Sequence, residues 1–402
     1  MELVPTERMQ SATILHKKAK VYFPGLNSLR FFAALLVFVS HVEQFKQLFG
    51  YEHAYDNQAV HQVGNLAVTF FFVLSGFLIT YLLFVERENS QDISIKNFYI
   101  RRFLRIWPLY YLIVVLGMFI LPQIQSLYTP SLLSALYQDF SSKLFFYIIF
   151  LPQVVLISFS RTLYIEPTWS IGIEEQFYLI WPLLVKFFPN FKKLIISLLA
   201  TVVLIKLTLF AVPKITDNEV LETVTTFGKS YLHFARFQCM IIGGIGAYVL
   251  YYRLQRVLDF VYNKYFQVAI FCLLGFGLVS GIYAGPIHHE LYSVLFLIII
   301  LNIATNPKSI IKIEYAFLNY LGTISYGIYM FHEIAIGLVL QILSTSFQLT
   351  FTEFSDSVLL YILSLITTIV IAACSYELFE AKFLSLKKRF SLVVSGNPAN
   401  KD

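Results

Sequence analysis

Charged residues are scarce in this chain. They make up 13% of its 402 residues, whereas a soluble domain carries about 25%. Hydrophobic residues reach 57% and the mean hydropathy is +0.69, which is typical of a polytopic membrane protein. Because helices satisfy their own backbone hydrogen bonds in lipid, we predict an all-α polytopic membrane protein.

Cysteine is scarce too, and several familiar motifs are missing. Cys239, Cys272 and Cys374 lie in apolar stretches at unrelated spacings, so they indicate neither a disulfide framework nor a metal site. Lys and Arg form no cluster long enough for a nucleic-acid groove, so we attribute the net charge of +6 to cytoplasmic loops. Hydrolase, zincin and Walker motifs are also missing. We therefore expect no metal and no nucleic acid, and any chemistry must come from side chains of separate helices.

Apolar runs, oriented by the distribution of Lys and Arg, predict the topology. Counting from both ends gives about ten transmembrane helices with both termini cytoplasmic. The expected domains are an N-terminal tail over 1–22, a transmembrane domain over 23–390 and a C-terminal tail over 391–402. The predicted spans are 26–45, 66–85, 107–121, 171–185, 194–212, 231–252, 265–283, 291–305, 315–343 and 357–379.

The two counts agree only if the segment 122–170 stays outside. The apolar stretch 144–159 then does not cross fully, because its length is marginal and Pro152 interrupts it. We predict an interfacial or re-entrant helix there.

The first predicted span contains two ionisable residues, Arg30 and His41. Eleven helical steps turn about 1100° and rise about 16 Å, so both side chains share one face at opposite depths. Ionisable groups within a span are costly and usually line a cavity or pathway. The alternative is an arginine at the cytoplasmic rim and a histidine at the outer rim.

Arg102 and Arg105 lie three residues apart, and hence on one helical face, where the third span begins. Neighbouring guanidinium groups offer bidentate donors suited to a phosphate. With Arg101 beside them, the segment is also compatible with a positively charged anchor on the cytoplasmic side.

Glu174 and Glu175 begin the predicted span 171–185 at its outer side. A carboxylate there would orient a histidine or accept its proton. Adjacent residues point about 100° apart, so at most one faces a given site. The alternative is an exposed pair that favours a helix N-terminus.

Two other segments place polar side chains inside spans. Ser75, in FFFVLSGFL, can hydrogen-bond across helices. In SYGIYMFHE, Tyr326, Tyr329 and His332 fall near one face, with Glu333 beside them. Packing is the alternative in both segments. We take Ser75 and the three residues of that face as candidates that line a site.

Five segments, in this order, resemble the membrane-bound acyltransferase-3 family: NSLRFFAALLVFVSH, FFFVLSGFLI, FYIRRFLRIWPLYY, TWSIGIEEQFYLIWP and ISYGIYMFH. Each is weak alone, but five in order at matching spacing are specific, and they cover about 24–382. This family O-acylates carbohydrates and other envelope acceptors. The chain resembles its stand-alone transmembrane form.

The resemblance implies roles for the residues singled out above. It implies acyl-CoA, most often acetyl-CoA, as the cytoplasmic co-substrate. It also implies a carbohydrate or lipid-linked glycan as the acceptor, in a bacterial cytoplasmic (inner) membrane. The residues expected to bind acyl-CoA are Arg30, Arg102 and Arg105, and those expected to be catalytic are His41, Glu174 and Glu175.

We hypothesise that His41 is the general base toward the acceptor hydroxyl and that one of the two glutamates orients it. A covalent acyl-His41 intermediate is the main variant. A multi-pass transporter or exporter without acyl transfer is the alternative function, because ionisable residues along one face also suit transport. A scaffold in an envelope pathway is a third reading.

Overall fold

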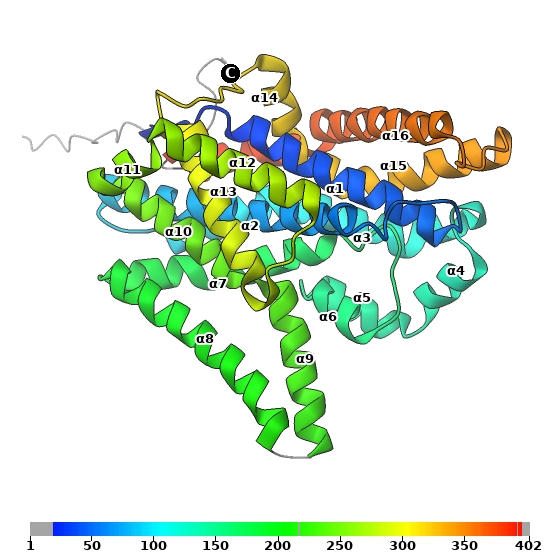
Figure 1. The fold of residues 1–402 in the computed structure, drawn as a ribbon, viewed down its shortest axis with the longest axis horizontal. Helices are drawn as coiled ribbons and strands as arrows, with labels where there is room; N and C mark the ends of the chain where they lie inside the picture. The colour runs from blue at the N-terminus through cyan, green and yellow to red at the C-terminus, as the bar shows by residue number, and fades with distance from the viewer. Residues whose placement is uncertain (1–18, 216–217, 392, 396–402) are drawn as a thin grey trace, which may run out of the picture.

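The computed structural model describes residues 19–215, 218–391 and 393–395. Its long helices run side by side in a bundle (Figure 1), so the predicted all-α class is confirmed. The longer helices are α1 (Leu26–Leu48), α2 (Gln58–Ser90), α3 (Ile95–Val115), α7 (Thr168–Phe187), α8 (Phe191–Ile215), α9 (Glu219–Ala235), α10 (Phe237–Tyr251), α12 (Lys264–Ser280), α13 (His288–Thr305), α15 (Ser325–Ser346) and α16 (Phe354–Ser375).

Shorter elements connect these helices. The short α-helices are α4 (Pro130–Tyr137), α5 (Phe140–Ile148), α6 (Pro152–Ser158), α11 (Gln255–Val261), α14 (Ala316–Thr323) and α17 (Ala381–Lys387). The π- and 3₁₀-helical turns are η1 (Leu116–Ile120), η2 (Leu121–Gln123), η3 (Gln125–Leu127), η4 (Gly285–Ile287), η5 (Tyr376–Glu380) and η6 (Lys388–Phe390).

The number of spans is lower than predicted when helices are counted by length and composition. Within the described residues, eight helical segments are long and apolar enough to cross a membrane, and the pair α11–α12, bent by 61°, is a ninth if it counts as one span. The remaining predicted span is in α7, which is not among them. The consecutive polar residues Glu174, Glu175 and Gln176 make that helix less apolar than the others.

The two ends of the described chain are neighbours. Strand β1 (Ala19–Val21) pairs in parallel with β2 (Val393–Ser395), with Ala19 opposite Val393. The predicted tails over 1–22 and 391–402 fall mostly outside the described residues.

Three predicted apolar segments are broken. Arg236, at φ 42°, separates α9 from α10 within 231–252, and Ile324 separates α14 from α15 within 315–343. The stretch 144–159 is divided between α5 and α6, which have nine and seven residues. Since a spanning helix needs about 20 residues, this stretch forms no continuous span, as expected.

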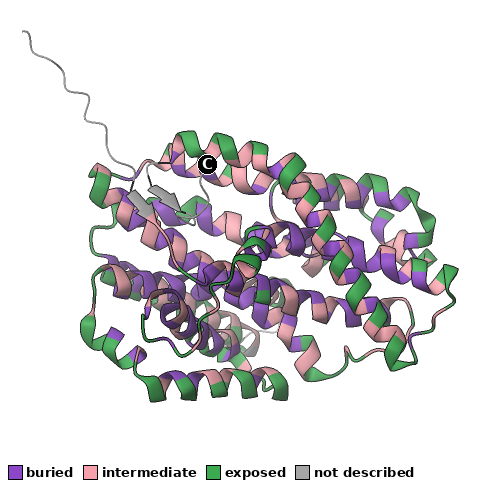
Figure 2. Cartoon of the chain, turned by 90° about the horizontal axis from the view of Figure 1, so that it is seen from above, coloured by how far each residue is buried: buried purple, intermediate pink, exposed green. Residues whose placement is uncertain are grey.

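Helix α2 lies at the centre and packs against α1, α10 and α13. At its crossing with α10 the backbones touch: a Cβ on Gly76 would lie 1.9 Å from Met240 O, and one on Gly243 would lie 2.0 Å from Val73 O. Only glycine permits this approach. Buried residues are concentrated in the central helices (Figure 2), whereas α8 and α9 project away from the bundle (Figure 1).

Candidate functional site

His41 of α1 contacts two residues of α15. Its Nδ1 lies 2.5 Å from His332 Nε2, and the two rings are nearly parallel, with 12° between their planes. Glu333 Oε1 lies 3.5 Å from the same Nδ1. His332 and Glu333 are each 1% exposed, whereas the His41 side chain keeps 22% of its surface accessible. Space therefore remains beside the His41 ring.

The hydrogen bonds of this pair assign the imidazole tautomers. His332 Nδ1 lies 2.6 Å from the carbonyl oxygen of Tyr329, so Nδ1–H donates to that oxygen. The lone pair of His332 is then on Nε2, and His41 Nδ1–H must donate to it. His41 Nε2 is left with a free lone pair, which is what a general base or a nucleophile requires.

The same three residues also offer three ligand atoms within 4.8 Å of one another, a spacing that a metal ion could use. Two nitrogens that bind one Zn²⁺ at about 2.0–2.1 Å in tetrahedral geometry lie more than 3 Å apart. The 2.5 Å separation of His41 and His332 instead fits a shared proton. The arrangement of the pair therefore fits a hydrogen bond between the two imidazoles better than a shared metal ion.

A row of polar side chains on α7 extends from this pair toward the other end of α1. Ser170, Glu174 and Tyr178 are spaced four residues apart and so share one face over about 12 Å. Ser170 bonds the Tyr329 hydroxyl at 2.8 Å. Glu174 accepts from Ser75 at 2.7 Å and from Tyr178 at 2.8 Å. This row therefore connects the surroundings of the histidine pair with the interior at the opposite depth.

Glu175 faces elsewhere. Its Oε2 accepts from Trp107 Nε1 at 2.8 Å, and its Oε1 is buried without a partner. It lines a pocket of about 290 Å³ between α3 and α7, together with Arg102 and mostly apolar residues. The expectation that the two adjacent glutamates diverge is therefore met, and Glu174 is the one on the inner row.

Four cations gather at the opposite depth from His41. They are Arg30 of α1, Arg102 and Arg105 of α3, and Lys387 of α17, whose ammonium group is repelled by all three arginines. Among described residues, none of the four forms an ion pair with a carboxylate. Arg30 donates to Asn27 Oδ1 at 3.1 Å. Such a set of like charges favours a bound anion in addition to the longer-range attraction of Glu174, Glu175 and Glu380.

The Arg102 guanidinium is held by aromatic rings. It lies 5.6 Å from the Phe98 ring centroid and 5.5 Å from that of Tyr178, and its Nε is buried without a hydrogen-bond partner. The nearest carboxylates act only over a longer range: Glu174 attracts Arg30, and Glu175 attracts Arg102. Arg102 therefore keeps an unused donor.

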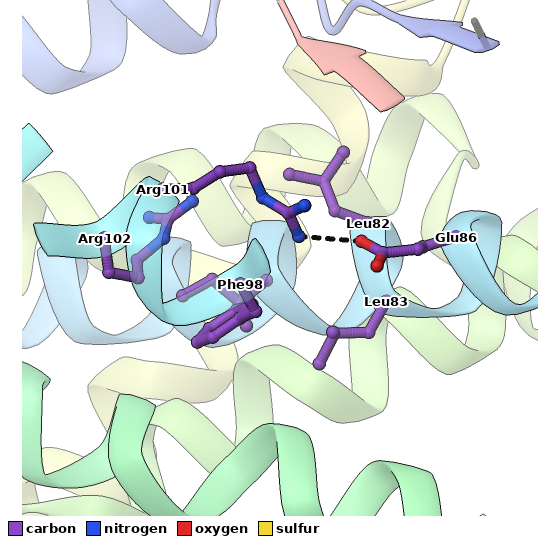
Figure 3. A pocket seen from close by; sticks show the side chains of 7 residues that line it. Leu82, Leu83, Glu86, Phe98, Arg101 and Arg102 are labelled. Carbon is purple, nitrogen blue, oxygen red and sulfur yellow. Dashed lines mark hydrogen bonds and ion pairs between the residues drawn. The ribbon is translucent and has the colours of Figure 1, made fainter. Parts of the chain in front are cut away.

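Arg101 is different from its neighbour. Its Nη2 pairs with Glu86 Oε2 at 2.7 Å, and its Nη1 donates to Phe390 O at 3.0 Å. Glu86 in turn accepts from the Ser94 backbone at 3.0 Å. Figure 3 shows Arg101 reaching Glu86, while Arg102 extends away from it. Arg101 therefore joins α3 to α2 through an ion pair.

A family model for the acyltransferase domain (Acyl_transf_3) matches residues 23–377. The chain belongs to the acyltransferase-3 family. The matched region includes every candidate site residue described above except Lys387.

Two curated relatives cover most of the chain. The peptidoglycan O-acetyltransferase OatA of Listeria monocytogenes is 26% identical over 381 residues, which is 90% of this chain and 56% of the relative. The O-acetyltransferase OatA of Staphylococcus aureus is 28% identical over 378 residues, 89% of this chain and 57% of the relative. The chain thus spans little more than half the length of these proteins. No solved structure matches it.

The structure divides the predicted site residues into two groups. One group is His41 with Tyr329 and His332. The other is Arg30, Arg102 and Arg105, with Ser75 and Glu174 between the groups. Tyr326 donates to Ile106 O at 2.9 Å and fixes α15 on α3.

The predicted contact between His41 and Glu174 or Glu175 is wrong: both carboxylates bond elsewhere, and the carboxylate beside His41 is Glu333.

Sequence reasoning missed three residues. Glu333 was noted only as the neighbour of His332. Ser170 lies four residues before Glu174 in TWSIGIEEQFY, and this spacing could have placed both residues on one helical face. Lys387 lies in the C-terminal segment, about 280 residues from Arg105 in the sequence. No local pattern connects it with the arginines.

Proposed function

We propose that this acyltransferase-3 protein moves an acyl group, preferably acetyl, from acyl-CoA at one membrane face to a hydroxyl of an envelope carbohydrate at the other. The observation that carries the proposal is the division of α1 between two sites. His41, with a free Nε2 lone pair, lies at one depth, and Arg30, within a cation cluster that forms no ion pair among the described residues, lies at the other.

The cation cluster is proposed to hold the phosphates of CoA in the cytoplasm. Arginines suit phosphate because their planar fork donates two parallel hydrogen bonds. The basic residues at the same end, Arg101 and Lys388 among them, support a cytoplasmic location for the cluster, because cytoplasmic segments of membrane proteins are rich in Lys and Arg. Arg30 and His41 are about 16 Å apart along α1. An extended pantetheine arm can cover such a distance, following the polar row of α7.

His41 is proposed as the general base. Its Nε2 takes the proton of the acceptor hydroxyl while that oxygen bonds to the thioester carbonyl carbon. The carbon–sulfur bond then breaks, and the proton passes from His41 to the CoA thiolate. Glu333 lies beside the imidazolium that forms and stabilises its charge, and His332 keeps Nδ1–H oriented. In the covalent variant, the same lone pair attacks the thioester directly.

Reconstituted vesicles test the proposal. Acetyl-CoA carrying a labelled acetyl group is enclosed, peptidoglycan fragments are supplied outside, and release of free CoA and labelling of the fragments are both measured. We expect CoA release to depend on the acceptor and to match the acetyl transferred. A transporter would produce neither signal. Intact acetyl-CoA together with unlabelled fragments would overturn the proposed function.

A further inference from the structure

Unpartnered polar atoms gather beside His41, on the side away from the cation cluster. Two buried oxygens there lack a partner in the described structure, Glu333 Oε2 and the hydroxyl of Tyr128, whereas Glu166 Oε1 forms an ion pair with Arg161 Nε at 3.1 Å. Glu333 interacts electrostatically with each of the other two residues. Buried polar atoms without partners are uncommon and call for an explanation. A ligand with several hydroxyl groups would satisfy them.

The segment that presents Glu166 is fixed on the helices of the catalytic pair. Tyr164, at φ 72°, is fully buried; its hydroxyl donates to Leu127 O at 2.6 Å and its ring packs against Phe45 of α1. On the other side, a Cβ at Gly337 of α15 would lie only 2.4 Å from the Tyr164 ring. A residue with a side chain is seldom held at positive φ unless the surroundings impose it. The segment therefore holds Glu166 in a defined position relative to His41.

The ionisable side chains of this region differ in how much of their surface is exposed. The side chain of Arg161 is 36% exposed and that of Glu166 is 13% exposed, with Arg161 Nε 3.1 Å from Glu166 Oε1. The His41 side chain is 22% exposed, which is more than that of Glu166. Arg161 also interacts electrostatically with His41 and with Tyr55, whose hydroxyl accepts from Gln44 of α1. Arg161 is thus the most accessible of these groups and acts on His41 from the partly exposed side of the region.

We propose that Arg161, Glu166 and Tyr128 form the binding subsite for the acceptor sugar and orient one of its hydroxyls toward His41. The inference rests on the proposed function. Glu166 and Tyr128 accept hydrogen bonds from sugar hydroxyls, and Arg161 donates to a ring or carbonyl oxygen. Since Arg161 is already balanced by Glu166, and Glu333 adds a carboxylate, the subsite favours an uncharged, hydroxyl-rich portion of the acceptor over a phosphate.

The test separates the acceptor from the donor. Arg161→Gln and Glu166→Gln are each assayed in vesicles with peptidoglycan fragments and acetyl-CoA. We expect the KM for the fragments to rise about tenfold in each variant. This rise corresponds to the loss of one or two hydrogen bonds to the acceptor, each worth about 0.5–1.5 kcal/mol. The KM for acetyl-CoA should stay within about twofold. The matched control is Lys206→Gln with Glu290→Gln, an ion pair between α8 and α13, which should change neither KM.

Binding of labelled acetyl-CoA by each variant shows that the protein is folded. An unchanged acceptor KM in Arg161→Gln and Glu166→Gln, with the unmodified chain active, overturns this inference and leaves the proposed function standing. An equal rise in both KM values overturns it as well, because that indicates general damage. If the unmodified chain releases no CoA, the proposed function fails first and this inference fails with it.

Discussion

The two ends of α1 hold ionisable groups in opposite ways. His41 is paired: its Nδ1–H donates to His332 Nε2, and it lies beside the Glu333 carboxylate. Arg30 belongs to a cation cluster that has no ion-pair partner among the described carboxylates. A paired cluster can move a proton without first binding an ion, whereas an unpaired one is completed only by an anion. This difference is the reason for proposing catalysis at the His41 end and donor binding at the Arg30 end.

The largest effect is expected at the paired end. His41→Ala should lower acyl transfer at saturating substrates by about 10³-fold, because a positioned base contributes about 10²–10⁴-fold. Donor binding should persist, since the cation cluster is intact. Transfer is measured in vesicles and donor binding with labelled acetyl-CoA. Transfer within tenfold of the unmodified chain would show that His41 is not the base.

Glu333→Gln should have the second largest effect and lower the kcat of acyl transfer by about 100-fold. The amide keeps the shape of the side chain but cannot stabilise the imidazolium of His41. Glu174→Gln is the matched comparison, because Glu174 bonds Ser75 and Tyr178 and does not contact His41. If Glu174→Gln lowered kcat more than Glu333→Gln, Glu174 and not Glu333 would be the carboxylate that orients His41, as the sequence analysis expected.

Arg102→Ala together with Arg105→Ala should raise the KM for acetyl-CoA by about 30-fold with kcat nearly unchanged at saturation. The double variant loses the proposed hydrogen bonds from the two guanidinium groups to the phosphates of CoA, and such charge-assisted bonds are worth about 1.5–3 kcal/mol. Arg101→Ala is the control. It breaks the ion pair with Glu86, so it should lower the unfolding temperature and leave the donor KM alone. Identical behaviour of the two variants would favour the anchor reading for all three arginines.

Much of this arrangement could be predicted from the sequence. Polar residues stand out in an apolar chain, and helical periodicity placed Arg30 and His41 on one face. The partner of His41 could not be found that way, since His332 lies 291 residues away and the adjacent Glu174 and Glu175 offered themselves as its carboxylates. The break at Arg236 has no proline or glycine beside it, so tertiary packing decides where that apolar run is interrupted, whereas Gly322 lies two residues before the break at Ile324.

The smallest effect is expected at Lys387, which tests whether the cation cluster at the Arg30 end of α1 is held for a ligand. Lys387→Met removes one of four like charges, so in the absence of ligand it relieves repulsion and should leave stability equal or higher. With an anionic donor bound, the same change removes an attraction of about 1 kcal/mol or less and should raise the KM for acetyl-CoA about threefold. Opposite signs in the two measurements are the signature of a cation held for a ligand. A loss of stability with an unchanged KM would instead make Lys387 part of the packing between α17 and α3.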